Sequence, residues 1–137
     1  MGEPLNLGEE TLLEIRGLKK YFPIKKGIFR RNAGWVQAVD GVSLYVGKRE
    51  TLGLVGESGC GKSTIGRCIL RLLEPTEGEI LFEGKNIRGL DSAGMKRFRR
   101  KVQAIFQDPY SSLNPRMSVG HIVGEPLLVQ GLHPESK

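Results

Sequence analysis

The amino-acid sequence predicts an α/β fold, in which an antiparallel β layer is followed by part of a parallel sheet with helices. Two observations carry this prediction. The first third of the chain has short stretches of alternating polarity, such as residues 12–16 and 42–46, which are typical of half-buried strands. Residues 52–55 are instead apolar on both faces, as in a buried parallel strand, and run through a glycine-rich turn into a helical pattern.

The opening third contains the predicted antiparallel layer. In residues 12–16, Leu13 and Ile15 fall on one face of a strand. Residues 17–34 are rich in glycine and basic side chains and contain Pro23, so a loop or loose hairpin is expected there. Two further strands, residues 36–39 and 42–46, are expected to be joined by a turn at the Asp-Gly pair between them.

The glycine-rich turn fits the pattern G-x-x-x-x-G-K-[ST] of P-loop nucleotide hydrolases, at Gly56, Gly61, Lys62 and Ser63. In such a loop, backbone N–H groups and the positive end of the next helix converge on an anion. Lys62 would add a charge for the outer phosphates, and the Ser63 hydroxyl would bind Mg²⁺. The alternative is a glycine-rich turn that binds nothing. The residues expected at the nucleotide are Gly56, Glu57, Ser58, Gly59, Cys60, Gly61, Lys62, Ser63 and Thr64.

The helix after this phosphate loop (residues 56–64) is expected to end at residues 74–78. Its apolar face would consist of Ile65, Cys68, Ile69, Leu72 and Leu73. An alternating strand follows at residues 79–82.

Two more helices and a strand are expected in the rest of the chain. Asp91 or Ser92 would cap a short basic helix that reaches about Arg100. Residues 102–106 form a second apolar strand pattern, and residues 108–117 form a loop. Ser118 would cap a last helix, bent or interrupted at Pro126.

Composition limits the class of protein. Apolar residues make up 39% and charged residues 26% of the 137 residues, which is typical of a globular domain. No apolar run reaches the roughly 18 residues of a membrane span, and the N-terminus lacks a signal-peptide pattern. The cysteines Cys60 and Cys68 do not suggest a disulfide framework, so a reducing, cytoplasmic compartment is expected.

The net charge of +6 is concentrated in residues 19–31 and 96–101. Such clusters could bind nucleic acid or an anionic lipid surface. Solvated loop and helix faces explain them better, and no aromatic residues are interleaved as in a nucleic-acid platform. We therefore expect no nucleic-acid partner.

The order of these features resembles the ATP-binding subunits of ABC transporters, and most of all those of dipeptide and oligopeptide importers. The resemblance covers residues 12–131. Beside the phosphate loop, it is carried by the runs LKKYFPI at residues 18–24, AVDGVSL at 38–44 and FQDPYSSLNPR at 106–116. The first and last of these runs point to the peptide-importer branch.

The resemblance implies roles for three more residues. Tyr21 would stack on adenine, although a tyrosine in a loop could equally serve packing. Gln107 would reach Mg²⁺ or the attacking water as a catalytic and metal-binding residue, together with Lys62; its alternative is a strand-end amide that satisfies backbone groups. Thr64 would touch the inner phosphate, or merely cap the helix.

The resemblance also implies an organisation and partners. Residues 1–10 would be a leader, 11–107 a partial nucleotide-binding core with the A-loop, Walker A and Q-loop, and 108–137 the start of a helical subdomain. The cofactors would be ATP and Mg²⁺. The partners would be a second ATP-binding subunit in a homo- or heterodimer, transmembrane permease subunits and, indirectly, an extracytoplasmic peptide-binding protein. The expected location is the cytoplasmic face of the cell membrane.

The signature sequence, the Walker B aspartate, the catalytic glutamate and the switch histidine of this family have no counterpart in residues 1–137. We therefore expect a fragment, truncated before those segments, that is inactive by itself as an ATP hydrolase. Three other interpretations stay open from the sequence: a nucleotide-binding module that never hydrolyses, a small P-loop kinase, and an ABC-type ATPase without a transport role. The transported solute is not determined by these residues.

Overall fold

The computed structural model describes residues 11–26, 31–108 and 113–132. The chain divides into two compact units, Met1–Leu90 and Asp91–Lys137. The first unit contains the whole sheet and the phosphate loop, and the second contains two helices. Within the described ranges, no helix is long and apolar enough to cross a membrane.

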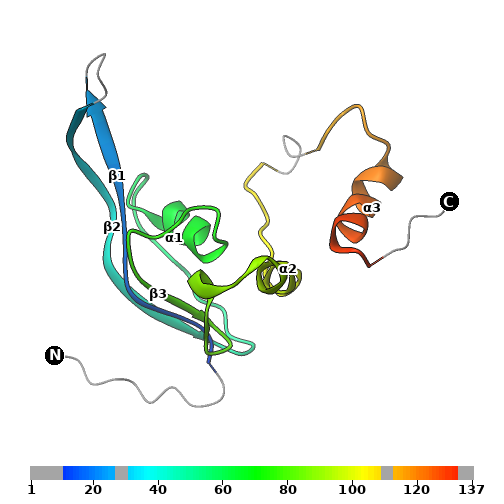
Figure 1. Cartoon of the computed structure of the whole chain (residues 1–137), viewed down its shortest axis with the longest axis horizontal. Coiled ribbons are helices and arrows are strands. Elements are labelled where there is room, and N and C mark those ends of the chain that lie inside the picture. Colours follow the sequence, from blue (N-terminus) through cyan, green and yellow to red (C-terminus); the bar gives the residue numbers. More distant parts are fainter. Residues whose placement is uncertain (1–10, 27–30, 109–112, 133–137) are drawn as a thin grey trace. The chain divides into compact units, whose positions relative to one another are not determined.

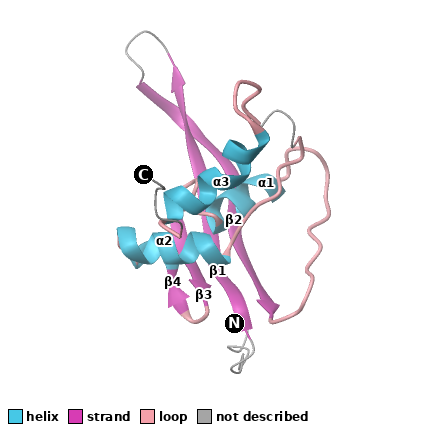
Figure 2. Cartoon of the chain, turned by 90° about the vertical axis from the view of Figure 1, so that its right-hand side faces the viewer, coloured by secondary structure: helices cyan, strands magenta, loops and turns pink. Residues whose placement is uncertain are grey.

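The sheet of the first unit has four strands in the order β2-β1-β3-β4, and every neighbouring pair is antiparallel (Figures 1 and 2). The strands are β1 (Thr11–Lys26), β2 (Arg31–Gly47), β3 (Glu77–Phe82) and β4 (Lys85–Asn86). The predicted antiparallel layer is thereby confirmed.

Of the two structures expected at residues 17–34, a loop or a loose hairpin, the structure has the hairpin, because most of this stretch belongs to β1 and β2, which pair antiparallel. Even Pro23 lies in β1, opposite Trp35. Proline is tolerated there because β3 pairs with β1 only from Leu13 to Lys19, so the described residues place a single neighbouring strand, β2, beside Pro23. The connection at residues 27–30 lies outside the described residues.

The Asp40-Gly41 pair is a bulge in β2, not the predicted turn. Leu18 pairs with Val42 and Lys20 pairs with Val39, so two residues of β2 stand opposite Lys19 alone. Gly41 has a φ of 69°, a left-handed conformation that glycine adopts without steric cost. The bulge keeps β2 continuous and changes the direction in which the Asp40 side chain leaves the strand.

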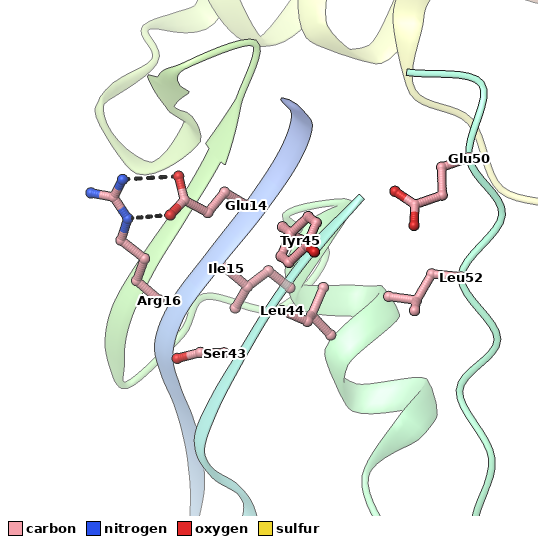
Figure 3. A pocket seen from close by; sticks show the side chains of 8 residues that line it. All are labelled: Glu14, Ile15, Arg16, Ser43, Leu44, Tyr45, Glu50 and Leu52. Carbon is pink, nitrogen blue, oxygen red and sulfur yellow. Dashed lines mark hydrogen bonds and ion pairs between the residues drawn. The ribbon is translucent and has the colours of Figure 1, made fainter. Parts of the chain in front are cut away.

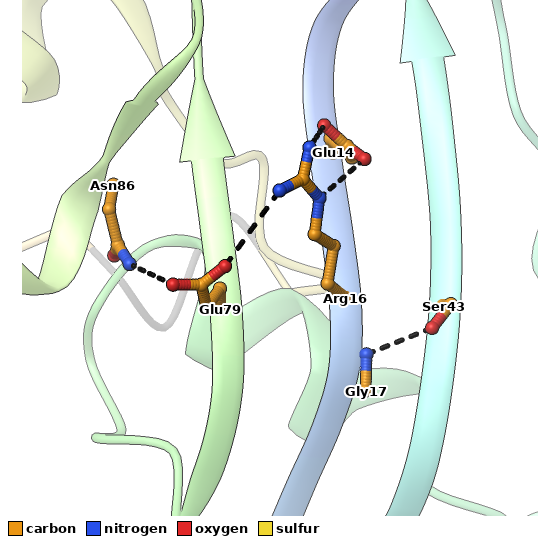
Figure 4. Close-up of polar contacts among 6 residues, drawn as sticks. All are labelled: Glu14, Arg16, Gly17, Ser43, Glu79 and Asn86. Carbon is orange, nitrogen blue, oxygen red and sulfur yellow. Dashed lines mark hydrogen bonds and ion pairs between the residues drawn. The ribbon is translucent and has the colours of Figure 1, made fainter. Parts of the chain in front are cut away.

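The core of the first unit lies between one face of the sheet and helix α1 (Lys62–Ile69). Leu18, Ile80 and Cys68 are fully buried, and Ile65 faces the same core as predicted. On the opposite face, an exposed network of Glu14, Arg16, Glu79 and Asn86 crosses three strands (Figure 4). The alternation read from residues 12–16 therefore corresponds to the two faces of β1.

Helix α1 ends at Ile69, earlier than predicted. Arg71 has a left-handed φ of 51°, which stops the helix. Its guanidinium donates hydrogen bonds to the carbonyls of Ile87 and Leu90, each at 3.1 Å, and forms an ion pair with Glu74 at 2.8 Å. Those bonds tie the turn to the short 3₁₀ helix η1 (Ile87–Gly89). No pattern in the helix sequence signals this arrangement.

The second unit contains α2 (Ser92–Lys101) and α3 (Val119–Gln130). Both predicted N-caps are confirmed: Asp91 accepts a hydrogen bond from the Gly94 N–H at 2.7 Å, and Ser118 accepts one from the His121 N–H at 3.3 Å. Helix α3 continues through Pro126, so the interruption considered at this proline does not occur.

The two apolar strands predicted at residues 52–55 and 102–106 do not form. Val55 and Ile105 are 97% and 99% exposed. A strand is defined by hydrogen bonds to a neighbour, and the described residues offer no neighbouring strand to either segment. The apolar pattern of both segments describes a buried environment that these residues alone do not provide.

Candidate phosphate-binding site

The phosphate loop connects residues 52–55 to α1 and is largely exposed. Its turn is closed by a hydrogen bond from the Cys60 N–H to the Glu57 carbonyl at 3.4 Å. The helix begins with a bond from the Ile65 N–H to the Gly61 carbonyl at 2.9 Å. The structure thus has the strand-end, loop and helix order of a phosphate loop, although residues 52–55 lack strand pairing.

Gly61 lies directly against β2. A Cβ atom at this position would be 2.3 Å from the Ala38 carbonyl oxygen and 3.5 Å from Cγ2 of Val39. Its φ of 98° is also in the left-handed region. Gly61 therefore allows the start of α1 to contact the strand, and this contact fixes the loop relative to the sheet.

The start of α1 has the properties of an anion site. No side chain caps the helix at Gly61, and its first turn contains no acidic residue. The first N–H groups of a helix lack partners within the helix, and the helix dipole adds positive potential at the same point. A phosphate group would satisfy both, as the sequence pattern predicts.

The Lys62 ammonium lies over the loop. It donates hydrogen bonds to the carbonyl oxygens of Gly56 at 2.7 Å and Glu57 at 2.6 Å, and it lies 3.3 Å from Sγ of Cys60. The loop therefore holds its own cation among exposed backbone groups. This arrangement suits ATP, because an ammonium next to uncapped N–H groups is complementary to a polyphosphate.

The other loop residues are open to solvent or partly so. Glu57, Ser58 and Ser63 are exposed, whereas Thr64 is half-buried. An exposed hydroxyl at Ser63, next to the helix start, suits a Mg²⁺ ion that takes its remaining ligands from phosphate and water. The positions of the predicted loop residues are therefore compatible with both ATP and Mg²⁺.

Tyr21 lies in β1, opposite Gln37 of β2, and makes two hydrogen bonds to side chains. Its phenol donates a hydrogen bond to Oδ1 of Asp40 at 2.5 Å, and its N–H donates to Oγ1 of Thr76 at 3.0 Å. The Thr76 N–H in turn donates to the Lys19 carbonyl at 2.8 Å. The bond to Asp40 raises the pKa of the Tyr21 phenol above its ordinary value, because the carboxylate favours the protonated phenol.

The predicted site residues are brought together only in part. Gly61 lies against Ala38 and Val39 of β2. Ala38 follows Gln37, which pairs with Tyr21 of β1. The loop and Tyr21 therefore lie along the same part of β2. Gln107 is exposed and belongs to the other unit, so its role stays a prediction. The sequence did not predict the contacts of Asp40 and Thr76 with Tyr21. The Asp-Gly pair indicated a turn, and no sequence pattern marks Thr76.

A cavity of about 410 Å³ opens elsewhere in the first unit, between the sheet and the segment after β2 (Figure 3). Glu50 and Leu52 face Leu44 and Tyr45 across it. Its one cation, Arg16, is bound to both carboxylate oxygens of Glu14, at 2.7 and 2.9 Å. Because that charge is already neutralised, the cavity does not suit a triphosphate.

Comparison with known families decides what this loop belongs to. The family model described as ABC transporter matches residues 39–133, which include the phosphate loop and Gln107. The chain belongs to the ABC transporter family.

Relatives in this family are similar over most of the chain. The oligopeptide transport ATP-binding proteins AppF and OppF of Bacillus subtilis are each 52% identical, over 91% and 93% of this chain. The dipeptide transport ATP-binding protein DppF of Haemophilus influenzae is 49% identical over 86% of it. The chain spans 38%, 40% and 36% of the lengths of these three ABC proteins.

Solved structures confirm the fold class. A dimeric ATP-binding cassette in a post-hydrolysis state with ADP and Pi matches with a TM-score of 0.74 and 25% identity, over 91% of this chain and 50% of that one. The cassette cbiO1 of Clostridium perfringens matches with a TM-score of 0.59 and 25% identity, over 77% and 38%. The antiparallel layer and α1 are thus the N-terminal part of an ABC ATPase domain.

Proposed function

We propose that this chain is the ATP-binding part of an ABC-type importer of dipeptides or oligopeptides, in which ATP hydrolysis by a dimer drives uptake. The site supports the ATP-binding step through one arrangement, the uncapped start of α1 beside the Lys62 ammonium. The names of AppF, OppF and DppF support the peptide substrate.

In this proposal the chain's own groups bind and orient the nucleotide. The N–H groups of the phosphate loop and Lys62 bind the phosphates, and Tyr21 stacks on adenine. Ser63 and Gln107 hold Mg²⁺, which supplies neutralisation of the phosphate charge when bound. Gln107 and Lys62 are the proposed catalytic residues, since phosphoryl transfer depends mainly on placement of water and charge.

The proposed partners follow from the family. They are a second ATP-binding subunit and transmembrane permease subunits, with an extracytoplasmic peptide-binding protein as an indirect partner. The chain would then act at the cytoplasmic face of the membrane as a peripheral subunit. The relatives' names include transport of oligopeptides and dipeptides, so both solute classes belong to the proposal.

The first test is Lys62→Ala. Loss of a charge-assisted bond to phosphate should weaken the binding of Mg²⁺-ATP by about 10- to 100-fold. Isothermal titration of the chain of residues 1–137 measures this, with Lys85→Ala, at an exposed position in β4, as the control for general charge loss. Equal weakening in both variants would contradict a specific role for Lys62.

The same proteins test hydrolysis. We propose that residues 1–137 bind ATP without turning it over, as a non-hydrolysing binding module would. Phosphate release from the wild-type chain should therefore equal release from Lys62→Ala. Turnover that depends on Lys62 would show that these residues contain a complete hydrolytic site.

A second test uses the two cysteines. Cys60 is exposed in the phosphate loop, whereas Cys68 is fully buried and burial raises the pKa of its thiol. A maleimide should modify Cys60 alone and thereby block ATP binding, and Mg²⁺-ATP should protect this thiol. Mass spectrometry of the labelled chain measures both sites, with Cys60→Ser as the control. Labelling of Cys60 at the same rate with and without ATP would place the nucleotide elsewhere.

A further inference from the structure

The Tyr21 side chain is anchored by a residue that belongs to a bulge. Asp40 and Gly41 stand together opposite Lys19, and this irregularity brings the Asp40 carboxylate to the Tyr21 phenol at 2.5 Å. The bond joins residues 19 positions apart on two strands. A regular ladder has no extra residue at this point, so the bond depends on the bulge.

We propose that Asp40 is a positioning residue, which holds the Tyr21 ring in the orientation that receives the adenine of ATP. The inference rests on the proposed function, because it takes Tyr21 as the adenine contact. Asp40 itself would not touch the nucleotide. It would act through the phenol hydroxyl at the edge of the ring and not through a face on which a base would stack.

The physical reason is conformational freedom. The Tyr21 residue is only half-buried, so packing alone restricts its ring less than in a core. A bond from the phenol to a carboxylate is charge-assisted and therefore stronger than a bond between neutral groups. An ordered ring loses less freedom when the base binds, so part of the binding cost is met before the nucleotide arrives.

The backbone beneath the ring is held independently. The Tyr21 N–H bonds to Thr76, and the Lys20 ammonium donates to the Glu74 carbonyl at 2.8 Å. Both partners lie on the turn after α1, so the strand stays in place when the phenol loses Asp40. Removal of the Asp40 carboxylate should therefore release the Tyr21 ring without unfolding the hairpin of β1 and β2.

The experiment compares two ligands that differ in the base. Mg²⁺-ATP has adenine and phosphates, whereas Mg²⁺-tripolyphosphate has the phosphates alone. In the chain of residues 1–137, Asp40→Ala should weaken ATP binding by about fivefold, the factor expected for one hydrogen bond, and leave tripolyphosphate binding unchanged. Asp40→Asn, which keeps an acceptor oxygen, should recover part of the affinity.

A double-mutant cycle identifies the pair. Tyr21→Phe keeps the ring but has no phenol, so it should weaken ATP binding about as much as Asp40→Ala does. Adding Asp40→Ala to Tyr21→Phe should then cause no further loss. If the two substitutions weaken ATP binding independently, so that their fold-losses multiply in the double variant, the role of Asp40 is overturned.

Ultraviolet titration of tyrosinate shows whether the bond between Tyr21 and Asp40 forms in solution. The difference between each protein and its Tyr21→Phe counterpart isolates the Tyr21 phenol. Its pKa should fall in Asp40→Ala, because the carboxylate bond that raises it is gone. An unchanged titration would show that the bond does not exist in solution.

Tyr21→Ala separates this inference from the proposed function. If Tyr21→Ala weakens ATP binding and Asp40→Ala does not, the adenine contact stands and the positioning role fails. If Tyr21→Ala leaves ATP binding intact, the adenine contact itself fails and the positioning role fails with it. Equal losses of ATP and tripolyphosphate in Asp40→Ala would show general damage to the fold and also overturn the inference.

Discussion

Gly61→Ala should abolish ATP binding, with a loss of at least about 100-fold. The added methyl group would lie 2.3 Å from the Ala38 carbonyl oxygen, a rigid backbone atom of β2. It would also force a side chain into a φ of 98°, which by itself costs about 1–2 kcal/mol. The start of α1 would have to move away from the strand, and the N–H groups that we propose bind phosphate would move with it.

Gly66→Ala is the matched control, because Gly66 lies in the same helix, four residues after Lys62. A Cβ at Gly66 meets nothing within 4 Å, so alanine fits there and should stabilise α1 by up to about 1 kcal/mol. Titration calorimetry with Mg²⁺-ATP should therefore show binding in Gly66→Ala and none in Gly61→Ala. Normal binding by Gly61→Ala would mean that the contact with β2 does not position the loop.

Gly78→Ala should destabilise the first unit by about 2–5 kcal/mol, the sum of backbone strain and overpacking. Gly78 lies in β3 at the irregularity between the pairs Lys19–Glu77 and Arg16–Glu79, and it has a φ of 88°. A Cβ there would lie 2.5 Å from the Gly17 carbonyl oxygen and 2.7 Å from that of Arg16. Because both atoms belong to the β1 backbone, the strands would have to separate at this point.

Urea unfolding of the chain, followed by circular dichroism, measures this effect. Gly84→Ala is the control, because Gly84 also has a positive φ, 74°, but a Cβ there meets nothing within 4 Å. The free energy of unfolding of Gly84→Ala should fall by about 1–2 kcal/mol, the cost of placing a side chain in the left-handed conformation. A Gly78→Ala midpoint equal to that of Gly84→Ala would show that β1 adapts to the extra methyl group.

Local signals in the sequence were reliable because their causes are local. Asp91 and Ser118 cap their helices through bonds to N–H groups three residues away, so the residue type and its position suffice to predict them. The glycine pattern of the phosphate loop is also local, whereas the contact of Gly61 with β2 that positions the loop is not. The caps and the glycine pattern could be predicted without knowledge of the rest of the chain.

Features that depend on distant partners were not predictable in the same way. A loose hairpin was one of the two expectations for residues 17–34, but nothing within residues 17–26 indicates that β1 continues through Pro23, because that depends on its pairing with β2. Asp40 suggested a turn, but its bulge depends on the register with Lys19. Residues 52–55 show the reverse error, since their apolar pattern implies neighbours that the described residues do not supply. The role of Gln107 still rests on resemblance.

The Lys62 ammonium already has two carbonyl partners, Gly56 and Glu57, before any nucleotide arrives. A phosphate must displace those partners, so the ammonium contributes to affinity only the difference between the new bonds and the old ones. When a phosphate leaves, the ammonium can form its hydrogen bonds to Gly56 and Glu57 again. Because Lys62 has these two partners without a ligand, its hydrogen bonds favour rapid release of a bound phosphate group over tight retention.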